Sequence, residues 1–252
     1  MRSNTAGAWF ATGHTRTQAE FKLFCFPYAG GTASLYRGWV KPLAALAQVI
    51  PVELPGRGTR LKEPPFISMP PLIETLTKAI RPLLDSRFAF FGHSMGAVIG
   101  FELAQRLRGE QAAEPEALFI SGRRAPQLSD SDPITYNLPK DEFIAELRRL
   151  DGTSKEVLEH AELMELILPL LRADFQLIES YEYHGRPPLT CPIIAYGGQQ
   201  DRESPRDQLR AWQAQTSSNF ALHMLPGDHF FIRSSESLLL QSLTRELTGL
   251  LR

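Results

Sequence analysis

The chain has 252 residues, which is enough for one large domain with a continuous core or for two small ones. Its content of 43% hydrophobic and 22% charged residues is that of an ordinary globular protein. The formal net charge is −1, so the overall charge gives no support for binding to nucleic acid or to an anionic membrane surface.

The N-terminal 20 residues are small and polar with isolated aromatic residues, and we expect a mostly loose arm there. Neither a secretory signal nor a run approaching the ~18 apolar residues of a membrane span is apparent, which predicts a cytoplasmic protein. The two cysteines, Cys25 and Cys191, lie in apolar stretches. This placement favours buried, reduced thiols over a disulfide.

From residue 21 onwards, short apolar runs alternate with helical periodicity, which predicts an α/β protein with a mainly parallel sheet. Each run is nearly continuously apolar, as expected for strands covered by helices on both faces. The six predicted strands are Phe21–Phe26, Val49–Leu54, Phe88–Phe91, Ala117–Ser121, Cys191–Tyr196 and Phe220–Leu225. The segments between them carry apolar residues at i, i+3 and i+4, which indicates helices packed on the sheet.

Residues 138–185 break this alternation, because they contain helical signals without an intervening strand. We expect a helical lid insertion here, over the C-terminal edge of a sheet built from residues 21–137 and 186–252; an extra packed helical subdomain is the alternative. Pro169 should end or kink a helix, or start a new one. Residues 163–171 are so apolar that they should be buried or face an apolar cavity.

The stretch Gly92-His93-Ser94-Met95-Gly96 has the form Gly-x-Ser-x-Gly. The bare pattern is a weak signal, since a chain of this size contains one by chance about once in ten. Here, however, it joins a predicted strand to a predicted helix. A serine at such a turn is held in strained dihedrals that neighbouring glycines permit, and its Oγ points toward substrate. We therefore predict that Ser94 is a nucleophile; a structural turn is the alternative.

A serine hydroxyl needs a base that takes its proton. Of the six histidines, His229 follows the last predicted strand, in a loop that opens at the same sheet edge as Ser94. We predict His229 as general base and then general acid. The others lie in the arm, the serine turn, the insertion or a strand: His14, His93, His160, His184 and His223.

An acid must hold the His229 imidazole in the correct tautomer. Asp201 follows the fifth predicted strand at the same edge and is the predicted acid. Asp228 would have to fold back on its own neighbour, while Asp207 and Glu203 are fallbacks that we expect on a solvated helix face. The chain order Ser94, Asp201, His229 is that of α/β-hydrolases.

An oxyanion hole needs N–H groups aimed at the oxygen that becomes negative. The first predicted donor is the backbone amide of Met95, the residue after the nucleophile. The second is the backbone amide of Tyr28, in the loop after the first strand. Gly30 and Gly31 would let that loop turn close to the site; a mere flexible turn is the alternative.

Five stretches within residues 20–250 carry the motifs described above: "FCFPYAGGTA", "VELPGRGTR", "FFGHSMGAVIGFELA", "YGGQQD" and "PGDHFF". In this order and spacing they resemble the type II thioesterases that accompany polyketide synthases and nonribosomal peptide synthetases. The resemblance implies the α/β-hydrolase fold, a mainly parallel central sheet flanked by helices with a helical lid insertion. It also implies hydrolysis of aberrant or stalled acyl groups from the 4′-phosphopantetheine arm of carrier domains.

The predicted site residues fall on matching positions of that family: Ser94, Asp201 and His229 on its triad, Tyr28 and Met95 on its oxyanion donors. The family's acid is often followed by proline and valine, whereas Arg202 and Glu203 follow Asp201 here.

The resemblance further implies that the insertion shapes a short apolar acyl pocket, with Met95 and Phe230 in its wall. Arg57, and Arg60 near it, would approach the pantetheine phosphate or the acidic face of a carrier domain; a solvated or structural role is the alternative. The expected partners are acyl or peptidyl carrier domains, and we expect a monomer. The sequence shows no metal-ligand cluster, Walker loop or Gly-x-Gly-x-x-Gly motif, so no cofactor is implied.

Two other functions fit the same fold. One is a stand-alone carboxylesterase or acyl-CoA hydrolase, which a preference for oxygen esters over carrier thioesters would reveal. The other is a catalytically silent scaffold, against which the intact set Ser94, Asp201 and His229 argues.

Overall fold

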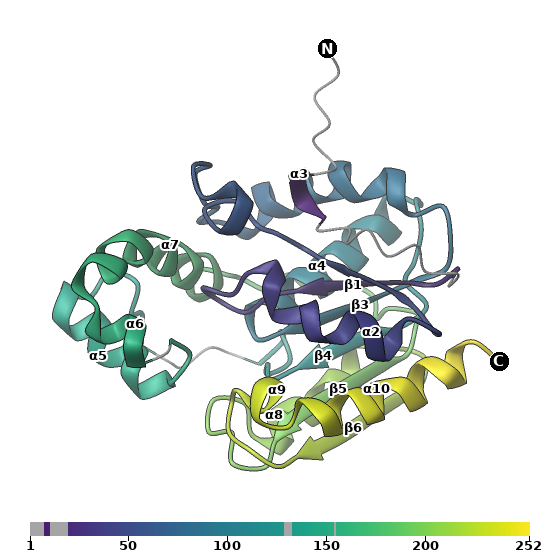
Figure 1. The fold of residues 1–252 in the computed structure, drawn as a ribbon. Coiled ribbons are helices and arrows are strands. Elements are labelled where there is room, and N and C mark those ends of the chain that lie inside the picture. The colour runs from purple at the N-terminus through teal and green to yellow at the C-terminus, as the bar shows by residue number, and fades with distance from the viewer. Residues whose placement is uncertain (1–7, 11–19, 129–132, 154) are drawn as a thin grey trace.

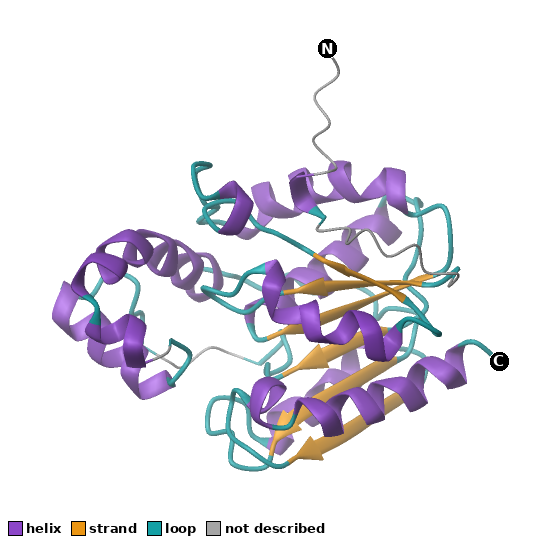
Figure 2. Ribbon diagram, viewed as in Figure 1, coloured by secondary structure: helices purple, strands orange, loops and turns teal. Residues whose placement is uncertain are grey.

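The computed structural model describes residues 8–10, 20–128, 133–153 and 155–252. Within these ranges, six parallel strands form one sheet in the order β2-β1-β3-β4-β5-β6, with helices on both faces (Figures 1 and 2). The strands are β1 (Lys22–Phe26), β2 (Gln48–Pro51), β3 (Phe88–His93), β4 (Leu118–Ser121), β5 (Ile193–Gly198) and β6 (Phe220–Leu225). All six predicted strands are confirmed, and the α/β fold with them.

Helices cover both faces of the sheet because each apolar strand must bury two sides. The helices are α2 (Val40–Leu43), α3 (Met69–Ile80), α4 (Met95–Gly109), α5 (Lys140–Leu150), α6 (Lys155–Glu159), α7 (Ala161–Glu179), α8 (Arg206–Arg210), α9 (Phe231–Ser234) and α10 (Glu236–Leu250). Four 3₁₀ helices within the described ranges are η1 (Ala33–Trp39), η2 (Gly58–Arg60), η3 (Arg81–Leu83) and η4 (Ala211–Gln215).

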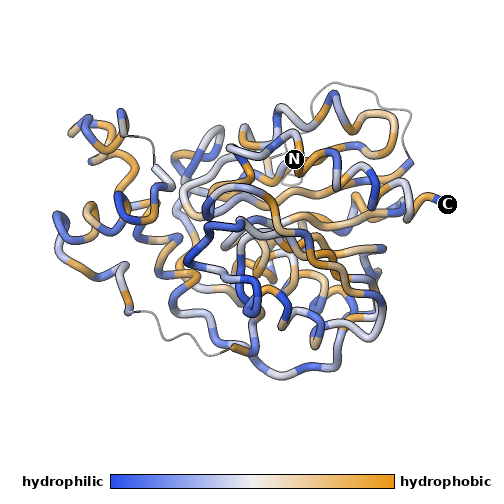
Figure 3. The backbone as a smooth tube through the Cα atoms, turned by 90° about the horizontal axis from the view of Figure 1, so that it is seen from below, coloured by the Kyte–Doolittle hydropathy of each residue, from blue (hydrophilic) through white to orange (hydrophobic). Residues whose placement is uncertain are grey.

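Two separate apolar clusters cover the sheet, one on each face, and a third, smaller cluster joins α5 to α7. The first joins α3 and α4 to the strands, and the second joins η1, α2 and α10 to them. Figure 3 shows the hydrophobic residues concentrated along the strands inside the molecule. Among the described strands, β6 departs most from the expected burial on both faces: it lies at one edge of the sheet, and all its residues are partly exposed.

The strand order reverses direction between β1 and β3. From β1 the chain passes to the edge strand β2 and then returns to β3 on the other side of β1. The loops that leave β1 and β3 therefore diverge at the carboxyl edge of the sheet, which is where open α/β sheets bind ligands. The register sets Phe26 opposite Gly92, so the loop after β1 begins beside the serine turn.

Helices α5, α6 and α7 lie between β4 and β5 and sit beyond the carboxyl ends of the strands (Figure 1). Pro169 neither ends nor starts a helix, because α7 continues through it; of the three alternatives, a kink stays a prediction. The expectation of burial for residues 163–171 holds only in part. Leu170 and Leu171 are buried, whereas Leu163 and Leu166 are 41% and 56% exposed. The assignment of residues 138–185 as a separate lid insertion stays a prediction.

The N-terminal segment was expected to be loose, and residues 8–10 contradict this. Trp9 is 3% exposed and lies under the guanidinium of Arg60, with 4.0 Å between the Arg60 Cζ and the ring centroid. Phe10 is 2% exposed and forms an antiparallel bridge with Val52. The aromatic residues of the arm thus complete the core beside β2. Residues 1–7 and 11–19, including His14, lie outside the described residues.

Both cysteines are free and buried, as predicted. Burial raises the pKa of the Cys25 thiol well above its ordinary value and that of Cys191 to about 12, so both stay protonated. Over the described part of the chain, every helix falls short of what crossing a bilayer requires in length and apolar character.

Replacing Trp9 by alanine should lower the free energy of unfolding by about 3 kcal/mol, because it removes a large buried ring from the core. Denaturant unfolding measures this loss, and Trp9→Phe, which keeps most of the buried surface, serves as the control. Equal stability of the alanine variant and the parent protein would show that this segment does not belong to the core.

Candidate active site

Ser94 occupies a sharp turn between β3 and α4. Its backbone has φ 52° and ψ −116°, a region that non-glycine residues rarely adopt and that costs about 1–3 kcal/mol. Its amide N–H donates to the carbonyl of Ser121 at 2.8 Å, which fixes the turn to the end of β4. The strain is therefore held in place by the sheet, and the side chain of Ser94 faces a cavity.

The glycines on both sides of Ser94 are required by close packing. A Cβ on Gly92 would lie 2.1 Å from the carbonyl oxygen of Gly96, and a Cβ on Gly96 would lie 2.2 Å from that of Phe26. Such distances are far below van der Waals contact. The glycines thus let α4 begin directly against the end of β1, which explains the Gly-x-Ser-x-Gly pattern physically.

His229 and Asp201 are joined as predicted. The Nδ1 of His229 lies 3.0 Å from Oδ2 of Asp201, whose side chain is completely buried. The other oxygen of Asp201 accepts hydrogen bonds from the backbone N–H groups of Glu203 at 2.9 Å and Ser204 at 3.2 Å. Since Nδ1 faces the carboxylate, Nε2 is the ring nitrogen left for chemistry.

The other carboxylates considered have other positions or partners. Of the two fallbacks, Asp207 is exposed in the first turn of α8, as expected, whereas Glu203 lines the cavity. The carboxylate of Asp228 accepts from the backbone N–H of Phe230, and the carboxylate of Glu203 pairs with Arg149. His223, in the edge strand β6, pairs with Glu246 at 2.9 Å, so its ring has a partner outside the cavity.

His93 is buried inside the turn rather than available as a base. Its Nδ1 lies 2.8 Å from the hydroxyl oxygen of Ser121, and its ring lies 5.2 Å from the ring of His229. Burial lowers the pKa of His93 well below its ordinary value, and the neighbouring His229 lowers it further. A neutral imidazole therefore packs beneath the predicted base.

The loop after β1 brings Tyr28 to the same cavity as Ser94. Its turn is closed by the N–H of Gly31, which donates to the carbonyl of Tyr28 at 2.8 Å. The amide of Met95 is at the first position of α4, where amides have no acceptor within the helix. The two predicted oxyanion donors thus flank the closely packed contact between Gly96 and the end of β1.

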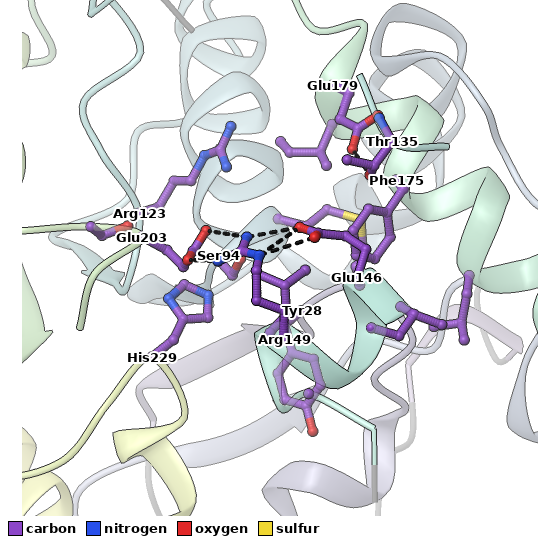
Figure 4. A pocket seen from close by; sticks show the side chains of 18 of the residues that line it. Tyr28, Ser94, Arg123, Thr135, Glu146, Arg149, Phe175, Glu179, Glu203 and His229 are labelled. Carbon is purple, nitrogen blue, oxygen red and sulfur yellow. Dashed lines mark hydrogen bonds and ion pairs between the residues drawn. The ribbon is translucent and has the colours of Figure 1, made fainter. Parts of the chain in front are cut away.

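The cavity has a volume of about 790 Å³, and Figure 4 shows Ser94, His229 and Tyr28 among its lining side chains. Met95 and Phe230 also line it, as expected for wall residues. Phe230 packs edge-on against Tyr28, with 5.2 Å between the ring centroids. Predicted residues from three distant segments therefore meet at one cavity, and Asp201 is joined to it through His229.

The expected short apolar pocket is only half right. Helices α5 and α7 do contribute to the lining, with apolar side chains such as Leu147 and Phe175. They also bring charge. Arg149 of α5 pairs with Glu146 at 2.7 Å and, across the cavity, with Glu203 of the core at 2.8 Å (Figure 4). The sequence missed this group, because surface charges at helical spacing predict only a solvated face.

For Arg57, the expected approach to a phosphate or a carrier surface is wrong, and the alternative of a structural role is confirmed. Its side chain is 2% exposed and makes a bidentate ion pair with Asp174 of α7, with Nη1 to Oδ2 at 2.8 Å and Nη2 to Oδ1 at 2.7 Å. Arg60 is likewise buried and donates to the carbonyl of Glu53. Neither guanidinium is presented to a phosphate or to a carrier surface, because both are used inside the protein.

Comparison with known proteins agrees with this geometry. The sequence matches the family described as Thioesterase domain over residues 21–247. The chain belongs to the thioesterase family. This thioesterase is 44% identical over 235 residues to the linear gramicidin dehydrogenase LgrE of Brevibacillus parabrevis, covering 92% of this chain and 89% of that protein.

Solved structures also resemble this thioesterase closely. RedJ, a thioesterase from the prodiginine biosynthetic pathway in Streptomyces coelicolor, is 39% identical with a TM-score of 0.82, covering 92% of each chain. The type II thioesterase BorB from the borrelidin biosynthetic cluster is 34% identical with a TM-score of 0.86, covering 95% of this chain and 98% of that one.

The matches establish the α/β-hydrolase fold and an enzyme that hydrolyses thioesters. The name of the gramicidin relative refers to a dehydrogenase, but the 252 residues of this thioesterase contain no Gly-x-Gly-x-x-Gly motif for a dinucleotide.

The buried His93 makes the stability of this thioesterase depend on pH. The pKa of His93 is lower in the folded than in the unfolded protein. Below about pH 6.5, the His93 imidazole therefore becomes protonated in the unfolded chain but stays neutral in the folded protein. Acidification from pH 7.5 to 5.5 should therefore cost stability on the order of 1 kcal/mol at this one residue. Urea unfolding at both pH values measures the cost.

His93→Asn is the matched variant, since its amide can replace Nδ1 toward Ser121 but does not titrate. The parent protein should lose more stability on acidification than this variant does. Identical losses in the two proteins would contradict a buried neutral imidazole.

Proposed function

We propose that this thioesterase is an editing, type II enzyme that removes aberrant or stalled acyl groups from the 4′-phosphopantetheine thioester of carrier domains. Ser94 is the nucleophile, His229 the acid–base and Asp201 the residue that orients it. The observation that supports the triad most strongly is the 3.0 Å contact between His229 Nδ1 and the buried Asp201 carboxylate, at a cavity that Ser94 also lines.

In the first half of the reaction, the Ser94 hydroxyl attacks the thioester carbonyl carbon while His229 Nε2 takes its proton. The carbonyl electron pair moves to oxygen, and the amides of Met95 and Tyr28 stabilise this oxyanion. Each such donor is worth about 3 kcal/mol in the transition state. When the carbon–sulfur bond breaks, the pantetheine sulfur receives the proton from His229 and an acyl-serine remains.

In the second half, His229 takes a proton from water, and the resulting hydroxyl attacks the acyl-serine carbonyl. The same two amides stabilise the second oxyanion. Its collapse breaks the bond to Ser94 Oγ, which recovers its proton from His229, and the free acid leaves. These steps use side chains, backbone amides and water, so the proposal includes no cofactor beyond the pantetheine arm of the substrate.

Two findings support carrier domains as the source of the substrate. The names of the relatives given above refer to linear gramicidin, to the prodiginine biosynthetic pathway and to the borrelidin biosynthetic cluster, and BorB is named a type II thioesterase. In addition, the cavity of about 790 Å³ gives room for an acyl group beside Ser94. The monomeric state and the cytoplasmic location stay predictions from the sequence.

Replacing the predicted nucleophile tests the triad directly. Ser94→Ala should lower kcat on an acyl-loaded carrier domain by about 10⁴-fold or more, and His229→Ala should be nearly as damaging, because the triad acts as a unit. His223→Ala, a histidine at the distant edge strand, is the matched control and should keep the parent rate. Mass spectrometry of the intact carrier measures deacylation; turnover by a folded Ser94→Ala protein would exclude Ser94 as nucleophile.

Substrate preference separates this proposal from a carboxylesterase. With the same acyl group, kcat/KM should be higher for the carrier-bound thioester than for the corresponding oxygen ester and for the acyl-CoA. The three values come from parallel assays on one enzyme preparation. A higher value for the oxygen ester would favour the carboxylesterase, and no hydrolysis of any of the three would favour the scaffold.

A further inference from the structure

The loop of residues 27–32, here called the oxyanion loop, is fixed firmly at its start. Phe26 is held there in two ways: its carbonyl accepts from the Tyr36 hydroxyl at 2.6 Å, and Gly96 of α4 packs on it without room for a Cβ. Past this point the loop leaves the sheet, so the ladder of β1 no longer defines its path. Tyr28, with the proposed donor amide, lies in this part of the loop.

Beyond Tyr28, the loop is held by a buried carboxylate from a different part of the chain. The amide N–H of Gly30 donates to Oδ2 of Asp174 at 2.7 Å. The same oxygen accepts from Arg57 Nη1, which also donates to the carbonyl of Gly31 at 3.1 Å. Asp174 and Arg57 therefore hydrogen-bond to two consecutive residues of the loop, Gly30 through its N–H and Gly31 through its C=O.

Helix α7 carries this carboxylate because of its spacing. Leu171 and Asp174 are three residues apart and lie on one face of the helix. Leu171 sits directly on Gly30, where a Cβ would come within 2.5 Å of its Cδ2. Gly30 itself has φ +77°, a conformation that favours glycine. The helix thus contacts the oxyanion loop through a leucine and a carboxylate side by side.

The far side of the pair is anchored in the loop after β2. Arg57 Nε and Nη2 approach the carbonyl of Pro55, each at 3.4 Å. Asp174 and Arg57 have only 3% and 2% of their side chains exposed. An ion pair that is this buried costs desolvation, and its replacement by apolar residues often leaves stability unchanged or improved. Stability alone is therefore a weak reason for this pair.

We propose that Asp174 and Arg57 are positioning residues that hold the oxyanion loop so that the Tyr28 amide points at the tetrahedral intermediate. This inference rests on the proposed function, since it assigns the Tyr28 amide to the oxyanion. It makes transition-state stabilisation depend on α7 being packed against the core. Neither side chain takes part in bond making; both act through Gly30 and Gly31.

The first test is the replacement of both members by apolar residues of similar length, Arg57→Met with Asp174→Leu. This double variant leaves no unpaired buried charge, so it avoids the main cause of misfolding in either single variant. We expect kcat to fall by about 10- to 100-fold, part of the effect of losing one oxyanion donor, with KM changed less than about 3-fold. A folded double variant with the parent kcat would overturn the proposal.

Arg172→Met is the matched control on the same helix. Arg172 donates to the carbonyl of Tyr136 and stacks on Phe143, and both of these partners lie outside the oxyanion loop. Its loss should disturb α7 to a similar degree without lowering kcat. If the control and the double variant lose kcat equally, the effect belongs to the helix as a whole and the proposal fails.

A pair of inhibitors distinguishes positioning from a structural role. Ser94 Oγ adds to the carbonyl carbon of an alkyl trifluoromethyl ketone while its proton passes to His229, and the electron pair displaced onto the ketone oxygen needs the oxyanion hole. The thioether analogue of the acyl-pantetheine has no carbonyl and binds as substrate does. In the double variant, the ketone should bind about 10-fold or more weakly, while the thioether binds as before.

Equal weakening of both inhibitors, or of neither, would contradict the proposal. This result is separate from the fate of the triad. If Ser94→Ala keeps turnover, the proposed function fails, whatever the double variant shows. If Ser94→Ala is inactive but the double variant binds the ketone as the parent protein does, only the positioning role of Asp174 and Arg57 is refuted.

Discussion

The close packing of α4 on the end of β1 is the contact on which the site depends. Gly96 lies so near the carbonyls of Phe26 and Pro27 that no side chain fits between them. This contact brings the start of the helix after Ser94 against the start of the oxyanion loop. It follows from the reversal of strand order between β1 and β3, which sets those two strands side by side although residues 27–87 lie between them in the chain.

In the register of the sheet, Phe26 pairs with Gly92, so the two segments leave the sheet from neighbouring positions.

Charge at the cavity is arranged in two distinct ways. In the loop after β5, the buried Asp201 carboxylate accepts hydrogen bonds from two backbone N–H groups and faces His229. Farther out, Arg149 of α5 pairs with Glu203 of the core, and its side chain is 54% exposed. Exposed pairs of this kind contribute about 0–1 kcal/mol and are screened by salt. The buried pair of Asp174 and Arg57 joins α7 to the core where water does not screen it.

Much of the fold and of the site could be predicted from the sequence. Continuous apolar runs specify buried parallel strands, and Gly-x-Ser-x-Gly between a strand and a helix specifies a strained turn. His229 and Asp201 could be chosen because loops that follow parallel strands open at the same edge. Arg57 was misjudged for a physical reason. A lone arginine beside glycines indicates a surface cation unless its partner is known, and that partner lies 117 residues away.

The sequence by itself determined the strands, the serine turn and the identity of the groups that could meet there, because these depend on local periodicity and on residues close in the chain. Only the tertiary structure decided which charges are buried together and how the helices between β4 and β5 contact the core. Those contacts join residues far apart in the chain, and their energies depend on burial. It was this packing that brought Trp9 into the core and placed charged residues in a cavity expected to be apolar.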